Sequence, residues 1–447
     1  MAEQDTIVAP ATPHGESALA LVRLSGPGAA RIARELHGGG PPLPRQAWHG
    51  DFIGVSGTLI DDVVCCFFAA PRSYTGEDVL EISCHGNPFI VRKILEDALA
   101  RGCRVAEAGE FTKRAFLNGR LDLTAAEAVM DVIRARSDRA LDAARQQLRG
   151  ALGRRIDRLV EDLLQCCAAI EAYIDFPEDD LPVEDRARRE EEIGALVEEI
   201  GRLQATRRHG ELLREGLRVV LVGAPNAGKS SLLNRLAGYE RAIVSPEPGT
   251  TRDFLEEPLL LGPHRIHVID TAGLREADGG VERAGVARSL ERAEEADLLV
   301  LVVDATLPCP ALPASVLERL TPERALVAVN KSDLAGARRF APPAGLAVPL
   351  VEVSAWTGDG VDALRAGLVA LADALTGSGA DEERVAVNAR HAAALDEAHQ
   401  SLGRAAGLLR SGGALELVGS ELRLAVGALG VIVGRIDQEQ VLDRLFA

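Results

Sequence analysis

The residues with the clearest chemistry form a glycine-rich segment, 223–230, that reads GAPNAGKS. It follows an apolar run at 217–222 and fits the pattern G-x-x-x-x-G-K-[ST] of a phosphate-binding loop. Its glycines let backbone N–H groups wrap phosphates, and the helix that follows presents its positive N-terminus. Lys229 can neutralise the β- and γ-phosphates, and the hydroxyl of Ser230 is a ligand for Mg²⁺. The residues expected to bind nucleotide here are Asn226, Ala227, Gly228, Lys229, Ser230 and Ser231.

Three more motifs follow strand-like runs in the order of a guanine nucleotide site: DTAG at 270–273, NKSD at 330–333 and SA at 354–355. Asp270 can hold Mg²⁺ through water, and the N–H of Gly273 can reach the γ-phosphate. Asp333 can accept two hydrogen bonds from guanine, and a backbone N–H near Ala355 can donate to the 6-oxo oxygen. Adenine would leave these groups unpaired, so such a site discriminates by roughly 10⁴-fold. The sequence predicts that GTP, not ATP, contacts Asp270, Thr271, Ala272, Gly273, Asn330, Lys331, Asp333, Ser354, Ala355 and Trp356.

Between the glycine-rich segment and the DTAG motif, the sequence at 249–253 reads GTTRD. In GTP-binding proteins this is the position of a switch segment that GTP orders. Thr251 is the expected second protein ligand of Mg²⁺, beside Ser230. The segment residues expected to contact GTP are Ser245, Pro246, Glu247, Pro248, Gly249, Thr250 and Thr251. Leu274 stands where Ras-like enzymes carry a water-orienting glutamine, so hydrolysis needs another carboxylate or amide. The positive charge that an arginine finger places beside the transferring phosphate must also come from elsewhere. Asn226 is a candidate for holding a monovalent cation there.

The elements that would position these motifs are apolar strands that alternate with helical patterns and lie at 218–222, 265–269, 298–303 and 325–329. This alternation predicts a P-loop GTPase domain at 213–376, with a doubly wound, mostly parallel sheet. Residues 1–118 carry short β-like runs and one helical stretch at 88–101, which is typical of an α+β domain. Residues 119–212 and 377–447 have helical texture. The predicted fold class is multidomain α+β and α/β, with the GTPase domain inserted into a helical domain made of two parts.

The composition describes an acidic chain with an ordinary apolar content. Its 447 residues carry a formal net charge of −17 and are 47% hydrophobic, so several domain cores can form. An acidic surface argues against indiscriminate nucleic-acid binding. Seven cysteines without a C-x-x-C pair, no secretory pattern and no apolar run of about 20 residues predict a soluble cytoplasmic protein. The eight arginines at 134–158 leave two interpretations open, a solvated helix face or a face for RNA phosphates.

Outside the GTPase motifs the sequence holds five further strings, DTIVAPATPHGE from residue 5, SYTGEDVLEISCHGN from 73, GEFTKRAFLNGRLDLTAAEAV from 109, VNARH from 387 and ELRLA from 421. These strings resemble signatures of the bacterial MnmE (TrmE) family of tRNA-modification GTPases. The resemblance spans nearly the whole chain and implies a homodimer formed through the N-terminal domain. It implies an MnmG-type FAD-dependent partner, in a heterotetramer or larger complex. Together such proteins add an aminomethyl or carboxymethylaminomethyl group to carbon 5 of the wobble uridine of certain tRNAs.

The same resemblance implies roles within the GTPase domain that the motifs alone leave unassigned. Members of the family are K⁺-stimulated GTPases, and the positions that match their K⁺ site are Asn226, Ser245, Glu247 and Thr250. Glu282 falls where the family carries its water-orienting glutamate, whereas by itself it is one acid on an exposed helix. Glu282 and Lys229 are therefore the expected catalytic residues.

In the N-terminal part, the resemblance implies binding of 5-formyl-tetrahydrofolate or a related folate. Arg23, Glu81 and Arg120 match the positions that contact it. A carboxylate can accept hydrogen bonds from the pterin, and cations suit the glutamate tail of the folate. Without the resemblance, Arg23 and Glu81 would be ordinary strand residues. The family usually ends in Cys-x-Gly-Lys, whereas this sequence ends in DRLFA at 443–447.

Two other functions remain open from the sequence. One is a regulatory or ribosome-assembly GTPase switch, whose nucleotide state only recruits partners. Folate binding would argue against it, because an assembly factor has no reason to bind folate. The other is a one-carbon transferase regulated by GTP, which loss of modified wobble uridine in a deletion strain would exclude.

Overall fold

The computed structural model of the chain describes residues 5–175, 183–239, 256–270, 296–308, 312, 314–334, 347–377 and 385–434. The described chain divides into two compact units. The first holds the residues up to Glu127, the segment Gly153–Glu161 and the described residues from Val426 on. The second holds Ala128–Leu152 and the described part of Asp162–Ala425. The domain limits at 118, 212 and 376 stay predictions.

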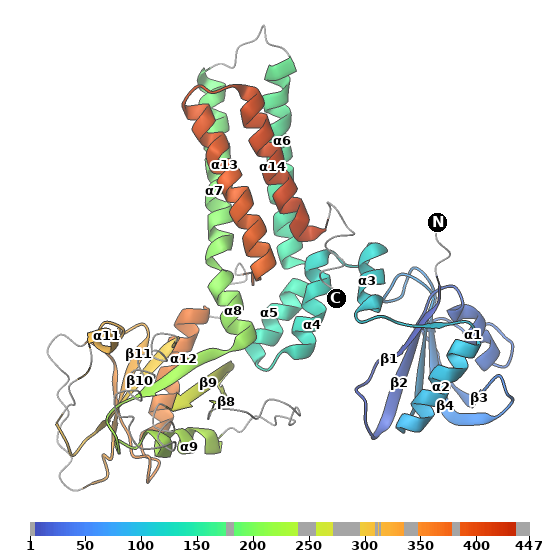
Figure 1. The fold of residues 1–447 in the computed structure, drawn as a ribbon, viewed down its shortest axis with the longest axis horizontal. Helices are drawn as coiled ribbons and strands as arrows, with labels where there is room; N and C mark the ends of the chain where they lie inside the picture. The colour runs from blue at the N-terminus through green and yellow to red at the C-terminus, as the bar shows by residue number, and fades with distance from the viewer. Residues whose placement is uncertain are drawn as a thin grey trace, which may run out of the picture. The chain divides into compact units, whose positions relative to one another are not determined.

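The first unit is built on a six-stranded sheet with two helices packed on one face (Figure 1). Its elements are β1 Ile7–Pro10, β2 Ser17–Ser25, α1 Ala29–Leu36, β3 Ala47–Ile53, β4 Leu59–Phe68, β5 Val79–Gly86, α2 Pro88–Ala100, β6 Arg104–Val105 and α3 Glu110–Leu117. The strand order is β3-β4-β5-β2-β1-β6, antiparallel except for the pair β1 and β6. Alternate residues of β5, Leu80, Ile82 and Cys84, share one core with Ile32 of α1 and Ile94 of α2. This unit has the predicted α+β character.

Helices from both sides of the predicted GTPase domain meet in the second unit. They are α5 Asp138–Leu148, α7 Val183–Ala205, α8 Arg207–Glu215 and α13 Ala389–Arg410, while α4 Leu123–Arg134, α6 Ala151–Asp175 and α14 Leu415–Val433 have residues in both units. Helices α7 and α13 run side by side (Figure 1). Their fully buried residues recur at helical spacing and include Ile193, Ile200, Leu395 and Leu402. A capping box of Asn388 and His391 starts α13. Helices from before and after the predicted GTPase domain thus pack together, as the predicted fold class requires, and the limits of the two helical parts stay predictions.

The second unit also contains a six-stranded sheet that carries the glycine-rich segment. Its elements are β7 Leu217–Val222, α9 Lys229–Tyr239, β8 Glu256–Leu261, β9 His264–Asp270, β10 Leu298–Asp304, α11 Ala314–Leu317, β11 Ala325–Asn330, β12 Leu350–Glu352 and α12 Val361–Thr376. The strand order is β12-β11-β10-β7-β9-β8, and every neighbouring pair is parallel except β8 and β9. The predicted doubly wound, mostly parallel sheet is confirmed.

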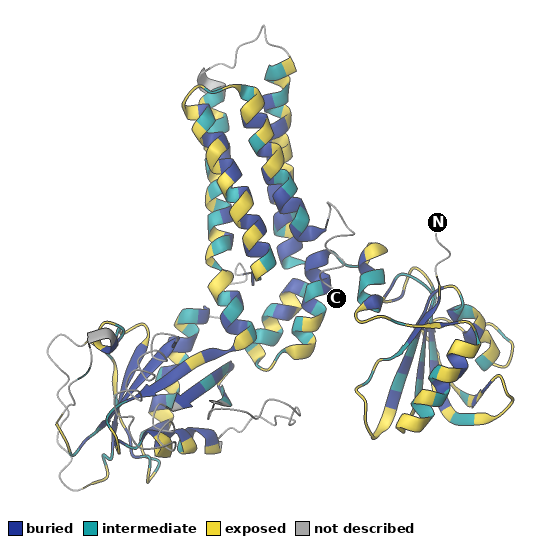
Figure 2. Ribbon diagram, viewed as in Figure 1, coloured by how far each residue is buried: buried dark blue, intermediate teal, exposed yellow. Residues whose placement is uncertain are grey.

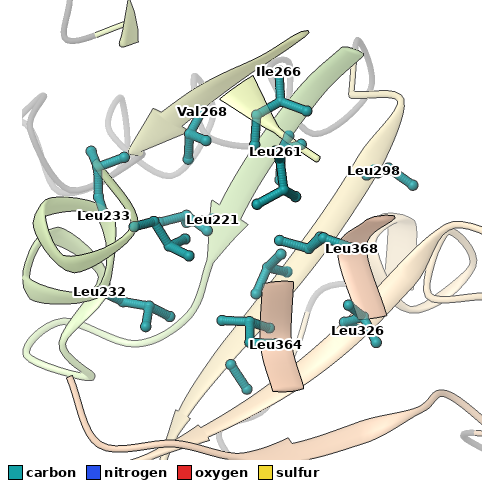
Figure 3. Packing of buried hydrophobic residues seen from close by; sticks show 14 of the residues in the cluster. Leu221, Leu232, Leu233, Leu261, Ile266, Val268, Leu298, Leu326, Leu364 and Leu368 are labelled. Atoms are coloured by element: carbon teal, nitrogen blue, oxygen red, sulfur yellow. The ribbon is translucent and has the colours of Figure 1, made fainter. Parts of the chain in front are cut away.

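The central strands β7, β10 and β11 are buried on both faces, as their dark blue indicates in Figure 2. Val219 and Leu221 of β7 join a core with α9 and α12, whereas Val220 and Val222 join a core that includes Val316 of α11. Successive side chains of a strand point to opposite faces, so β7 is covered on both sides, as is usual for parallel sheets. Figure 3 shows the core on the α9 and α12 side, including Leu221, Leu232, Leu233, Leu364 and Leu368.

The parallel pairing brings the sequence motifs to one edge of the sheet. The carboxyl ends of neighbouring parallel strands lie together, and ligands of open α/β sheets bind outside that edge. The glycine-rich segment follows β7, the DTAG motif begins at the end of β9, and the NKSD motif begins at the end of β11. The SA motif follows β12. The sheet therefore brings the glycine-rich segment, the NKSD and SA motifs and the first residue of the DTAG motif to one edge.

The turn between β8 and β9 is held by two helices of the same unit. The carboxylate of Asp373 in α12 is hydrogen-bonded to Arg139 of α5 at 2.6 Å and to His264 at 3.0 Å. The N–H of Arg139 also donates to the carbonyl of Pro263 at 3.3 Å. Burial lowers the pKa of His264, although the Asp373 carboxylate opposes this shift. These bonds fix the strand that leads into the DTAG motif to a helix that precedes the sheet.

Among the described residues, no helix is both long and apolar enough to cross a lipid bilayer.

Candidate nucleotide-binding site

The loop between β7 and α9 has the backbone that its glycines predict. Gly223 and Gly228 have φ angles of 155° and 93°, and Asn226 has a φ of 63°. A Cβ at Gly223 would collide with the carbonyl oxygen of Val302, and a Cβ at Gly228 would collide with the side-chain amide of Asn330. Only glycine combines these φ angles with the absence of a Cβ. Asparagine is among the few other residues that tolerate positive φ, which suits Asn226 to its position.

Lys229 is the first residue of α9 and is buried beneath the glycine-rich loop. It is 5% exposed, and its ammonium donates to the carbonyl oxygens of Gly223 and Ala224, both at 2.8 Å. Ser230 and Ser231 are exposed in the first turn of α9. The first N–H groups of a helix lack partners within the helix and attract anions. Loop, ammonium and helix N-terminus together form a cradle for phosphate.

Asn330 joins this loop to the loop after β12. Its side-chain nitrogen donates to the carbonyl of Ala227 at 2.8 Å, and its side-chain oxygen accepts the N–H of Ala355 at 2.9 Å. Asn330 is 2% exposed, so an unpaired amide there would cost about 1–3 kcal/mol. One buried side chain thus fixes the distance between the phosphate loop and the expected base loop.

The next residue of the NKSD motif is held by a carboxylate at the end of β10. The Lys331 ammonium pairs with Asp304 at 2.6 Å, and Asp304 also accepts from the N–H and hydroxyl of Thr306 at 2.9 and 2.6 Å. Burial would raise the pKa of Asp304, but the bonds from Lys331 and Thr306 outweigh it and lower that pKa. The φ of Lys331 is 65°, a conformation that costs about 1 kcal/mol or more outside glycine. The ion pair helps to offset that strain.

The loop after β12 is a tight turn of its own. The buried hydroxyl of Ser354 accepts the N–H of Thr357 at 3.1 Å, and the carbonyl of Ser354 accepts the N–H of Gly358 at 2.8 Å. Because the N–H of Ala355 is engaged by Asn330, the next N–H, that of Trp356, is the one that has no partner among the described residues. The side chains of Asp333 and Trp356 are exposed, the latter to 86%. A carboxylate and a backbone donor at this edge suit the two sides of guanine.

Several predicted residues lie wholly or partly outside the described residues. Asp270 ends β9 opposite Leu221 of β7, which places its backbone beside the strand of the phosphate loop, but its side chain is not described. The others outside the described residues are Ser245, Pro246, Glu247, Pro248, Gly249, Thr250, Thr251, Thr271, Ala272, Gly273 and Glu282. Their assignments stay predictions.

Sequence reasoning missed two residues of this site. Asp304 could have been found, because it ends a strongly apolar strand at the same sheet edge as the motifs. Arg235 gave no such signal. It lies on α9, and its guanidinium donates to the carbonyl of Trp356 at 2.6 Å, across 121 positions of sequence.

In the first unit, the structure places Arg23 and Glu81 directly opposite each other on β2 and β5. They form an ion pair at 2.7 Å, with about a quarter of each side chain exposed. The Arg23 guanidinium also lies 5.6 and 5.8 Å from the ring centres of Tyr74 and Phe111. Arg120 is exposed, and its stem borders Gly76 in the loop that carries Tyr74. A charged pair flanked by aromatic rings suits a planar, polar heterocycle.

Fold and site together define a P-loop protein of the guanine-nucleotide class. Two family models match the chain, the MnmE helical domain over residues 123–447 and the GTP-binding protein TrmE N-terminus over residues 6–120. The chain is 50% identical over 444 residues to the tRNA modification GTPase MnmE of Opitutus terrae, covering 99% of this chain and 98% of that protein. It is 45% identical over 457 residues to the tRNA modification GTPase MnmE of Symbiobacterium thermophilum, with 99% and 98% coverage. The chain belongs to the MnmE family.

Among solved structures, the G domain of the T. maritima FeoB iron transporter is 26% identical. The match covers 35% of this chain and 98% of that one, with a TM-score of 0.25.

Replacing Gly228 with alanine should weaken GDP binding by at least about 30-fold. The added methyl group must take the place of the Asn330 amide, and positive φ strains alanine, which together cost about 2 kcal/mol or more. Isothermal titration of GDP measures the effect. Gly238→Ala on α9, the helix that follows Gly228, is the control, because a Cβ there meets nothing within 4 Å. Parental affinity in Gly228→Ala would mean that the Gly228–Asn330 contact does not govern the site.

Proposed function

We propose that this chain binds and hydrolyses GTP and uses that cycle in tRNA modification, the activity for which its MnmE relatives are named. The observation that carries the proposal is the pair of bonds made by Asn330, to the carbonyl of Ala227 and the N–H of Ala355. Those bonds hold a phosphate cradle and a candidate base loop at a fixed separation. A generic anion site would need only the cradle.

Guanine selection is assigned to Asp333 and to the N–H groups after Ser354. Asp333 is exposed at the same sheet edge, where its carboxylate can accept from the ring N–H and the 2-amino group of guanine. The N–H of Trp356, the residue after Ala355, donates to the 6-oxo oxygen, because the N–H of Ala355 is bonded to Asn330. Adenine carries an amino group in place of that oxygen, so the donor would go unpaired. The proposed contacts therefore reject ATP.

Mg²⁺ is assigned to Ser230 and Thr251, with Asp270 acting through water. Ser230 fits this role, because it is exposed and its hydroxyl is a hard oxygen donor directly after Lys229. When bound, Mg²⁺ neutralises charge that develops between the β- and γ-phosphates. Lys229 supplies a second positive charge from inside the loop.

K⁺ is assigned to Asn226 together with the segment residues Ser245, Glu247 and Thr250. Asn226 fits, because its side chain is exposed from the phosphate loop and offers an amide oxygen. When bound, the cation takes the place of an arginine finger.

Glu282 is assigned to the attacking water. Its charge would repel the γ-phosphate, so it acts through a bridging water rather than by direct contact.

Replacing Glu282 with alanine should leave GTP binding unchanged and slow hydrolysis by about 10²-fold or more, the range of a lost positioning group. Turnover and binding are measured separately, in K⁺ and in Na⁺ at equal ionic strength. The parent should turn over faster in K⁺. Glu323→Ala, a change at an exposed acid of the same domain, is the control. Equal turnover of the parent in K⁺ and Na⁺ would contradict the proposed role of K⁺. Near-parental turnover of Glu282→Ala would contradict the proposed role of Glu282.

A folate of the 5-formyl-tetrahydrofolate type is assigned to the first unit, at Arg23, Glu81 and Arg120. The rings of Tyr74 and Phe111 beside Arg23 suit a stacked pterin, and Glu81 is a hydrogen-bond acceptor for it. A bound folate must either break the Arg23–Glu81 ion pair or hydrogen-bond to the two side chains while they remain paired. Folate affinity therefore depends on both partners.

Titration of 5-formyl-tetrahydrofolate into the full chain should show binding that Arg23→Ala and Glu81→Ala each weaken by about tenfold or more, the loss of a charge-assisted bond. Arg92→Ala is the matched control, because Arg92 is an exposed arginine on α2 that pairs with Glu96. Equal heats from the parent, Arg23→Ala and Glu81→Ala would exclude this pair from the folate site.

The assembly proposed for the chain is a cytoplasmic homodimer that works with an MnmG-type FAD-dependent partner on tRNA. The product is the aminomethyl or carboxymethylaminomethyl group on carbon 5 of the wobble uridine. The domains proposed to carry these roles are 1–118 for dimerisation and folate, 119–212 and 377–447 for the helical domain, and 213–376 for GTP.

A strain that lacks the gene should lose modified wobble uridine, as measured by mass spectrometry of tRNA nucleosides. The parental gene should restore the modification and Lys229→Ala should not, because that variant lacks the charge that the γ-phosphate requires. Asn234→Ala, on the exposed side of α9, serves as the control. Persistent modification in the deletion strain would favour a regulatory or ribosome-assembly switch instead.

A further inference from the structure

Arg235 connects the helix that follows the phosphate loop with the loop expected to bind the base. It lies six residues beyond Lys229 on α9, which is about 9 Å along the helix. Its guanidinium donates to the carbonyl of Trp356 at 2.6 Å. A Cβ on Gly358 would lie 3.5 Å from the guanidinium carbon, so the base loop also packs against the charged group. Arg235 thus contacts both halves of the turn around Trp356.

The loop from Ser354 to Gly358 is otherwise closed mainly on itself. The N–H groups of Thr357 and Gly358 bond to the hydroxyl and carbonyl of Ser354. Two side chains from outside the loop hold its first peptide groups. Asn330 accepts the N–H of Ala355, and Arg235 donates to the carbonyl of Trp356. The N–H of Trp356, which has no partner among the described residues, lies between these two anchors.

The usual alternative is a surface arginine that happens to reach a carbonyl and contributes little. Two features argue against it. The acceptor belongs to the residue whose N–H is proposed to face the 6-oxo oxygen of guanine, and the donor is on the helix that binds the phosphates. A bond between a charged donor and a carbonyl is worth about 1.5–3 kcal/mol when it is well formed.

Resting on the GTP-binding function proposed above, we propose that Arg235 is a positioning residue for base recognition. It fixes the peptide groups of Trp356 so that a backbone N–H meets the 6-oxo oxygen of the purine. It touches neither the phosphates nor the edge of guanine read by Asp333. Its role is therefore selective for purines with a 6-oxo group.

Three nucleotides separate this role from general destabilisation. GDP and IDP both carry the 6-oxo oxygen and differ in the 2-amino group read by Asp333, whereas ADP has a 6-amino group. In Arg235→Ala, the dissociation constants for GDP and IDP should both rise about tenfold, which corresponds to a loss of about 1.4 kcal/mol. Their ratio should stay constant, and the affinity for ADP should not change. Competition with a fluorescent GDP analogue measures all three on the full chain.

Arg235→Lys should bind GDP within about threefold of the parent, because an ammonium can still donate to the Trp356 carbonyl. Asn234→Ala, the neighbouring change on α9, should match the parent. At saturating GTP, turnover of Arg235→Ala should stay within about twofold of the parent, so that the Michaelis constant alone rises.

In a Trp48→Phe background, Trp356 is the remaining tryptophan. Its fluorescence anisotropy without nucleotide should fall when Arg235 is replaced by alanine.

Unchanged affinity of Arg235→Ala for GDP and IDP would overturn the proposal. So would an equal loss for GDP, IDP and ADP, because that is the sign of a damaged phosphate site. A parental chain that binds none of the three would instead contradict the proposed GTP function. The two failures are therefore distinguishable in one set of titrations.

Discussion

A single buried amide, that of Asn330, joins the two loops that are proposed to bind the phosphates and the base. Its nitrogen and oxygen are bonded to the phosphate loop at Ala227 and to the base loop at Ala355, at 2.8 and 2.9 Å. Because the group is buried, either bond left unmade would cost about 1–3 kcal/mol. The glycine at 228 follows from this constraint, since the amide occupies the space of a Cβ there. The strained φ of Lys331 and its pair with Asp304 follow from the same need to present Asn330 at the end of β11.

The sheet supplies the rigidity that this amide requires. Residues of β7 alternate between two separate cores, so the strand that leads into the phosphate loop is clamped on both faces. The neighbouring strands β10 and β11 are in register, with Asp304 opposite Asn330. At the other side of the sheet, Asp373 ties the β8–β9 turn to Arg139 of a helix that precedes the sheet. A displacement of β9 would therefore change the bonds that join it to α5 and α12 of the same unit.

The sequence predicted the parts of this site whose chemistry is local. GAPNAGKS, NKSD and SA are short segments in which spacing alone fixes what the backbone can do, and the alternating strands predicted the parallel sheet. Asp304 was not predicted, although its place at the end of an apolar strand could have revealed it. Arg235 was not predicted, because its partner lies 121 positions away and pairing at that range depends on the fold. The arginine-rich run at 134–158 stayed ambiguous for the same reason. Within it, Arg139 and Arg145 pair with Asp373 and Asp142. Ser245–Thr251 and Glu282 lie outside the described residues. The Mg²⁺ role of Thr251 rests on the position of the GTTRD motif, whereas the K⁺ role of the segment and the role of Glu282 rest on the family resemblance.

The central claim is that one amide makes the phosphate and base subsites a single guanine site. It is tested most directly by measuring the affinities of GDP and ADP for the parent and for Asn330→Ala. The account predicts that the parent prefers GDP by roughly 10⁴-fold, since ADP leaves polar groups of the site unpaired. It predicts that Asn330→Ala loses about 10²-fold or more in GDP affinity, because two bonds worth about 1–2 kcal/mol each disappear. Equal binding of GDP and ADP by the parent, or parental GDP affinity in Asn330→Ala, would contradict it.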